Sequence, residues 1–74
     1  MMTDSEVRTA VLERFDAIPS MDASDIDVHV KDGMVTLNGQ VDNHQTRFQV
    51  ERAVRKVPGV RGLKSHITPD RDAS

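Results

Sequence analysis

Residues 26–41 constrain the fold of this 74-residue chain more than any other segment. Branched aliphatic residues alternate with polar ones on both sides of Asp32-Gly33, and this period of two is typical of β-strands with one buried face. An Asp-Gly pair suits a two-residue type I′ turn, because glycine adopts positive φ without steric cost. The segment therefore predicts a β-hairpin, with strands of about 25–31 and 34–41. Its predicted facing pairs are Lys31 with Met34, Val30 with Val35, Val28 with Leu37, and Ile26 with Gly39.

Two helices are predicted, one on each side of the hairpin. Thr3 and Glu6 have the spacing of a capping box and precede apolar residues at helical intervals, which indicates a helix of about 4–17. Asp42 or Asn43 can cap a second helix, since either side chain can accept a hydrogen bond from the first turn. The apolar stripe of this second helix consists of Val50, Ala53, Val54 and Val57.

The second helix should end at Val57, because Pro58 disfavours the helical conformation in the residue before it. Glu51 and Arg55 have the i,i+4 spacing of a favourable ion pair on this helix. Beyond the helix, alternating apolar residues predict a third strand of about 61–68.

The order helix, strand, strand, helix, strand predicts an α+β fold. We expect a two-layer α/β sandwich, in which a three-stranded mixed sheet carries both helices on one face. The last two strands are joined through a helix, so they should run parallel. We expect the strand order 1-2-3, although the pattern also allows the third strand to lie beside the first. The predicted solvent face of the hairpin carries Asp27, His29, Lys31, Thr36, Asn38 and Gln40.

The chain is expected to form one domain over residues 1–74, with an ordered core of about 4–68 and a flexible tail at 69–74. Cysteine is absent, which excludes disulfides and thiolate metal sites. No segment approaches the roughly twenty apolar residues of a membrane span, and the first residues lack the apolar run of a signal peptide. We therefore expect a cytoplasmic localisation, or association with the envelope if the sequence is a domain of a longer exported protein.

Charge is distributed unevenly along the chain. Residues 1–43 carry nine acidic and three basic side chains, whereas residues 44–66 carry six basic ones and a single acid. One interpretation is that the charged side chains provide only solubility and ion pairs within the helices. The asymmetry can also create a basic surface that attracts anions or meets an acidic surface on another copy.

The second helix holds the candidate binding residues. Phe48 lies on the helix face opposite Val50, together with Arg52 and Arg55, and Lys56 follows. An exposed aromatic ring among cations is the composition of an anchor on an anionic lipid surface. Alternatively, Phe48 packs on Arg52, under the edge of the first helix, or against another copy.

Other kinds of site find little support in the sequence. His29 and His66 fall on the polar sheet face, but in the order 1-2-3 they lie about 9–10 Å apart, too far to share a metal ion. Only the alternative strand order would bring them together. The chain has no Gly-rich phosphate loop or nucleophile-elbow serine, so neither catalysis nor a cofactor is expected. With two aromatic residues in an acidic protein, no nucleic-acid partner is expected.

The hairpin segment IDVHVKDGMVTLNGQV resembles the core signature of the BON domain, in which a branched strand leads through a Gly turn into a Val-Thr-Leu-small-Gly-x-Val strand. Arg47, Ala53, Val54 and the run Val57-Pro-Gly-Val60 resemble its second helix and the exit from it. The resemblance covers about residues 5–68. The sequence departs from the family at Ser65, where many members place an asparagine that bears on a local backbone hydrogen bond. The matching signature residues are Val28, Gly33, Val35, Leu37, Gly39, Val41, Gly59 and Val60.

The resemblance implies a non-catalytic binding module. Members of the family are proposed to bind phospholipid membranes or hydrophobic and anionic ligands, and they are linked to osmotic or envelope stress. We therefore expect an anionic phospholipid surface or a protein as the partner. The alternative is a protein-interaction or self-association module that forms weak homodimers through an exposed edge strand or through charge asymmetry.

Overall fold

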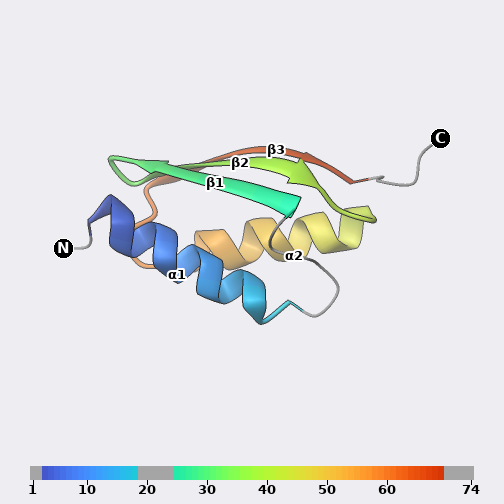
Figure 1. The fold of residues 1–74 in the computed structure, drawn as a ribbon, viewed down its shortest axis with the longest axis horizontal. Coiled ribbons are helices and arrows are strands. Elements are labelled where there is room, and N and C mark those ends of the chain that lie inside the picture. The colour runs from blue at the N-terminus through green and yellow to red at the C-terminus, as the bar shows by residue number, and fades with distance from the viewer. Residues whose placement is uncertain (1–2, 19–24, 70–74) are drawn as a thin grey trace.

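The structure, a computed structural model, describes residues 3–18 and 25–69. Figure 1 shows the strands in one layer and the helices packed side by side beneath a single face of that sheet. This arrangement confirms the predicted α+β sandwich. The elements in chain order are α1 (Asp4–Asp16), β1 (Ile26–Lys31), β2 (Met34–Gln40), α2 (His44–Arg55) and β3 (Gly62–Thr68).

The strand order is β1-β2-β3, as expected, with β2 antiparallel to β1 and parallel to β3. All four predicted facing pairs of the hairpin are present. Asp32 and Gly33 have φ values of 53° and 83°. A type I′ turn requires positive φ at both central residues, so the Asp-Gly pair closes the hairpin as its chemistry predicts.

Gly39 stands where two strands approach closely. A Cβ atom at this position would clash with the carbonyl oxygen of Asp25 and lie 2.9 Å from the Cα atom of Ile26. The neighbour that excludes a side chain is therefore the backbone at the start of β1.

Gly33 is required for a second reason besides its turn conformation. A Cβ atom there would lie 2.6 Å from Cγ of Arg61 and 3.0 Å from the carbonyl oxygen of Gly59. The Arg61 amide also donates a 2.7 Å hydrogen bond to the Gly33 carbonyl. The turn, the α2–β3 connection and the start of β3 are thus packed together at one end of the molecule.

The helix caps explain where both helices begin. The Thr3 hydroxyl accepts a hydrogen bond from the Glu6 amide, and the Glu6 carboxylate accepts one from the Thr3 amide, which confirms the capping box. Hydrogen bonds from the Thr3 amide and hydroxyl hold the pKa of Glu6 below its usual range. At α2, Asn43 rather than Asp42 is the cap, and its side chain accepts a 2.8 Å hydrogen bond from the Thr46 amide.

The predicted end of the second helix is two residues too late. Helix α2 ends at Arg55, and Lys56 is its C-cap. The Val57 amide bonds to the Val54 carbonyl, three residues back, instead of continuing the i to i−4 ladder. This tighter last turn suits the residue before Pro58, whose ring disfavours the α conformation there.

Apolar side chains from all five elements meet between the sheet and the helices. In the parts of the chain that the structure describes, twelve are buried and six more pack partly buried against them. The buried set is Val7, Val11, Phe15, Ile26, Val28, Val35, Leu37, Val41, Val50, Val54, Val57 and Ile67. It includes all the branched aliphatic signature residues except Val60, which is half-buried.

Ser65 also faces this core, between Leu63 and Ile67 on β3. Its hydroxyl oxygen is buried without a hydrogen-bond partner among the described residues. A serine therefore leaves a polar atom unsatisfied at the position where the sequence departs from the family pattern. The predicted tail at 69–74 lies, apart from Pro69, outside the described residues.

Candidate functional site

Helix α2 buries one face and exposes the other. Thr46, Val50 and Val54 are buried against the sheet layer. On the opposite side Phe48 keeps 62% of its surface exposed. Isolated exposed aliphatic groups are common on proteins, but a phenyl ring this exposed is a large apolar surface left in water.

The cations expected around this ring are on the same surface. Arg52 and Arg55 follow Phe48 by four and seven residues, so all three point from one helix face, and both arginines are exposed. Lys56, the C-cap residue, is also exposed. We call Phe48, Arg52, Arg55 and Lys56 the α2 face. The cations also interact favourably with the negative end of the helix dipole, which accounts structurally for part of their placement.

A further residue, Arg47, belongs to this surface and was not predicted from the sequence. Its guanidinium carbon lies 5.6 Å from the centroid of the Phe48 ring, within the range of a cation–π contact. The ring therefore stacks with its neighbour in the chain, Arg47. Because most of the ring is exposed, the alternative of packing under the edge of α1 is wrong.

The predicted ion pair between Glu51 and Arg55 is replaced by one a turn earlier. Glu51 Oε2 lies 3.9 Å from Nε of Arg47, at the outer limit of an ion pair. Glu51 has a basic residue at i−4 and another at i+4, and Arg47 is the one it approaches. Its carboxylate therefore helps to hold the arginine that stacks on Phe48, and Arg55 keeps its positive charge on the α2 face.

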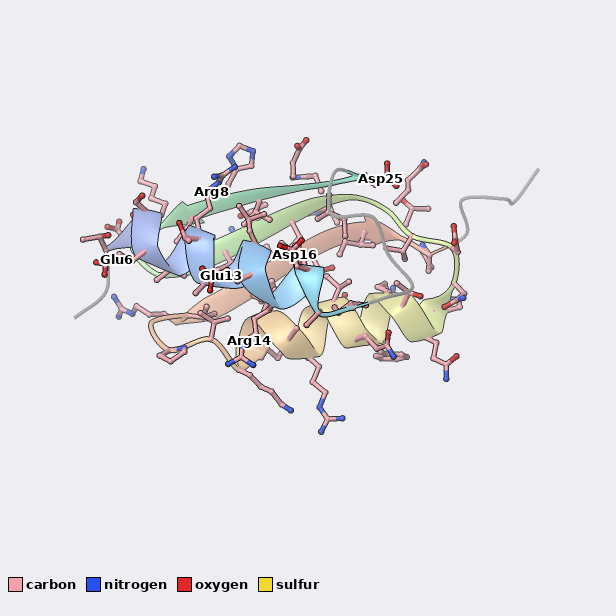
Figure 2. All side chains as sticks on the ribbon, turned by 60° about the horizontal axis from the view of Figure 1, so that its bottom comes forward. Glu6, Arg8, Glu13, Arg14, Asp16 and Asp25 are labelled. Carbon is pink, nitrogen blue, oxygen red and sulfur yellow. The ribbon has the colours of Figure 1, made fainter. Side chains whose placement is uncertain are left out.

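The neighbouring helix carries the opposite charge on its exposed surface. Glu6, Glu13 and Asp16 are exposed on α1, and Figure 2 shows Arg14 on the side of α1 next to α2. The charge asymmetry of the sequence is thus a spatial one within the helix layer. An anionic surface would be attracted by the α2 face and repelled by most of α1.

His29 and His66 do not lie side by side in the sheet. His29 on β1 pairs with Thr36, whereas His66 on β3 pairs with Asn38, so the two lie in different rows with β2 between them. Across residues 3–18 and 25–69, no group of three or more His, Cys, Asp or Glu side chains is placed to hold a metal ion.

Neither helix of the described chain is long and apolar enough to cross a bilayer. No curated protein matches this sequence. The BON domain family model matches residues 3–69, which include every described element and nearly the whole chain. BON domains are non-catalytic binding domains. With the helix-strand-strand-helix-strand order and the signature hairpin both in place, this chain belongs to the BON-domain family.

Proposed function

We propose that this protein is a non-catalytic binding module whose α2 face attaches reversibly to anionic phospholipid surfaces. The observation that carries the proposal is the 62% exposure of Phe48 on a helix face that also presents Arg52 and Arg55. In such an arrangement the ring enters the headgroup region while the guanidinium groups meet lipid phosphates. We further propose that this binding serves a response to osmotic or envelope stress, which is the setting implied by the family.

The expected affinity is modest. A basic residue near an anionic membrane contributes about 1 kcal/mol, and burying a phenyl ring completely contributes roughly 1.5–3 kcal/mol. Orientation and lost mobility offset a part of these gains. Binding should therefore need both the ring and the cations, and it should weaken as salt screens the charges. The acidic side chains of α1 should tilt the molecule so that α2 approaches the membrane first.

Co-sedimentation with vesicles tests the proposal directly. Wild-type protein should pellet with phosphatidylcholine vesicles that contain phosphatidylglycerol and stay in solution with phosphatidylcholine alone. Phe48→Ala should lose most of this binding. Met34→Ala is the matched control, because Met34 is also a large exposed apolar side chain but lies on the sheet, away from the helix layer. Equal binding by Phe48→Ala and wild type, or no binding by either, would overturn the proposal.

A second candidate function is self-association or binding of another protein. It is favoured by the acidic exposed side of α1 beside the basic α2 face, since two copies related by a twofold axis could place α1 of each against α2 of the other. Sedimentation equilibrium separates the two candidates. A dimer that dissociates at high salt and does not bind acidic vesicles supports this second function over the first.

A further inference from the structure

The open face of the sheet has a depression near the hairpin turn. The helices, and with them the α2 face, lie on the other side of the sheet (Figure 1). The depression has a volume of about 810 Å³ and is open to solvent. The residues around it come from all three strands and from the connection before β3. They include His29, Lys31, Met34, Thr36, Arg61 and Lys64.

The register of the sheet explains how these residues come together. Thr36 on β2 pairs with His29 on one side and Lys64 on the other, so the three side chains form a row across the sheet. The next row is Lys31, Met34 and Gly62. Neighbouring strands are about 4.8 Å apart, which places the outer members of each row about 9–10 Å from one another.

Met34 supplies an apolar surface in the lining, and Gly62, its neighbour across the row, has no side chain. A Cβ atom on Gly62 would lie 2.8 Å from Cε of Met34, so the methionine side chain lies across the glycine. Met34 is 39% exposed there. Lys31 and Lys64 are at the outer ends of their rows, and Thr36 is the central residue of its row.

The charge of the depression opposes that of the protein. Lys31, Arg61 and Lys64 are exposed cations, and Asp32 is the single acidic residue on its lining, whereas the whole chain has a net charge of −2. Within the described residues, none of the three cations has an ion pair with a carboxylate. Like charges gathered on a small area repel one another, and a bound polyanion would relieve that repulsion.

We propose that this depression binds the diphosphate group of a small soluble phosphate ester, with Lys31, Lys64 and Arg61 on the phosphoryl oxygens and Met34 beneath the organic part. Lysine and arginine side chains are long enough to converge on two linked phosphoryl groups from both sides of these rows. Arginine and lysine are the residues that meet phosphate oxygens through charge-assisted hydrogen bonds. The volume lies in the range of small-molecule sites.

A small ligand suits this face better than an extended anionic surface does. The row Asp27, Asn38 and His66 continues the same face of the sheet, so a carboxylate stands beyond the basic end. A membrane lying flat on the sheet would meet Asp27 as well as the cations, whereas a small ligand meets the basic end alone. The site is also distinct from the α2 face, so it does not depend on the proposed membrane binding.

The test is an NMR titration of the ¹⁵N-labelled protein with inorganic pyrophosphate, against sodium chloride at matched ionic strength. Saturable shifts are expected at the amides of Thr36, Lys64 and Arg61. Lys64→Gln and Arg61→Gln should each weaken the apparent affinity about tenfold, because each removes a charge-assisted contact. Arg52→Gln and Arg55→Gln on α2 are the matched controls and should leave pyrophosphate binding unchanged.

Three results would overturn the inference. They are the absence of saturable shifts up to about 10 mM pyrophosphate, shifts that map to α2, and unchanged affinity in a folded Lys64→Gln variant. A parallel titration with soluble dihexanoyl phosphatidylglycerol separates this site from the membrane site. The lipid should shift α2 amides, and Lys64→Gln should still bind acidic vesicles. Each proposal can therefore fail without the other.

Discussion

Arg8 donates a 3.2 Å hydrogen bond from Nε to the backbone carbonyl of Val28, twenty residues further along the chain. Figure 2 shows Arg8 projecting from α1 towards β1. In a hairpin with a two-residue turn, the pair next to the turn, here Lys31 and Met34, is hydrogen-bonded, and every second pair after it is hydrogen-bonded as well. Val28 and Leu37 form a pair that is not hydrogen-bonded, so the Val28 carbonyl points away from β2 to the open edge of the sheet. The guanidinium of Arg8 therefore occupies an acceptor that another strand would use.

Replacing Arg8 with alanine should loosen this edge. We expect a loss of about 0.5–1.5 kcal/mol in the free energy of unfolding, together with a greater tendency to self-associate through β1. Urea denaturation measures the first effect and sedimentation velocity over a range of concentrations the second. Arg14→Ala, on the same helix, is the control for self-association and should leave it unchanged. Identical behaviour of the two variants would show that the contact with Val28 does not protect the edge.

Two glycines of the sheet should respond very differently to alanine. A Cβ atom on Gly39 would meet the rigid backbone of Asp25 and Ile26, whereas one on Gly62 would meet only the flexible end of Met34. We expect Gly39→Ala to destabilise the protein by about 2–4 kcal/mol and Gly62→Ala by less than about 1 kcal/mol. Chemical denaturation of both variants checks this order. Comparable losses would mean that the strands move apart easily at Gly39.

The capping box of α1 predicts a dependence of stability on pH. The pKa of Glu6 is lowered first by the hydrogen bond from the Thr3 amide and then by that from the Thr3 hydroxyl. A carboxyl whose pKa falls on folding stabilises the native state above its unfolded pKa, here 4.5, and this contribution is lost as the pH falls through the folded value.

Thr3→Ala keeps the amide but removes the hydroxyl. The pKa of Glu6 should therefore rise towards 4.5 in this variant without reaching it, because the larger cause remains. A ¹³C NMR titration of the Glu6 carboxyl measures the change. In Glu6→Gln, the loss of stability on acidification through this range should become smaller than in wild type. An unchanged acid profile in that variant would contradict the link between the box and stability.

The sequence predicts those parts of the fold that depend on local chemistry. The pairing of Val28 with Leu37 follows from alternation and from the turn at Asp32, both of which act within a few residues. Where two local arrangements have similar energies, the sequence pattern does not decide between them. Asn43 and Asp42 are both good caps, and Glu51 has an arginine at four residues in each direction.

In the candidate sites, too, some features follow from local sequence patterns and others depend on contacts that those patterns do not describe. Phe48 was found from its helix angle, but its stacking on Arg47 joins adjacent residues, which helical spacing does not bring face to face. The basic depression on the sheet depends on the pairing of Thr36 with Lys64 across a crossover, a register set by how α2 packs and not by any local signal. Alternation correctly placed His29 and Lys31 on the exposed face, but it could not show which cations of β3 would join them.

Salt should separate the roles of the ring and the cations on the α2 face. Removing Arg52 and Arg55 together, as Arg52→Gln with Arg55→Gln, should weaken binding to acidic vesicles by about 2 kcal/mol at low salt, because each cation contributes about 1 kcal/mol near an anionic surface. The variant should also lose part of the salt dependence, since fewer cations on the α2 face remain to be screened. Phe48→Ala should bind more weakly than wild type at every salt concentration while keeping the wild-type slope. Vesicle co-sedimentation across a series of salt concentrations measures both quantities, with Lys31→Gln and Lys64→Gln together as the charge-matched control on the sheet. If that control weakened binding as much as the double arginine variant, attraction by the whole protein and not by the α2 face would explain the binding.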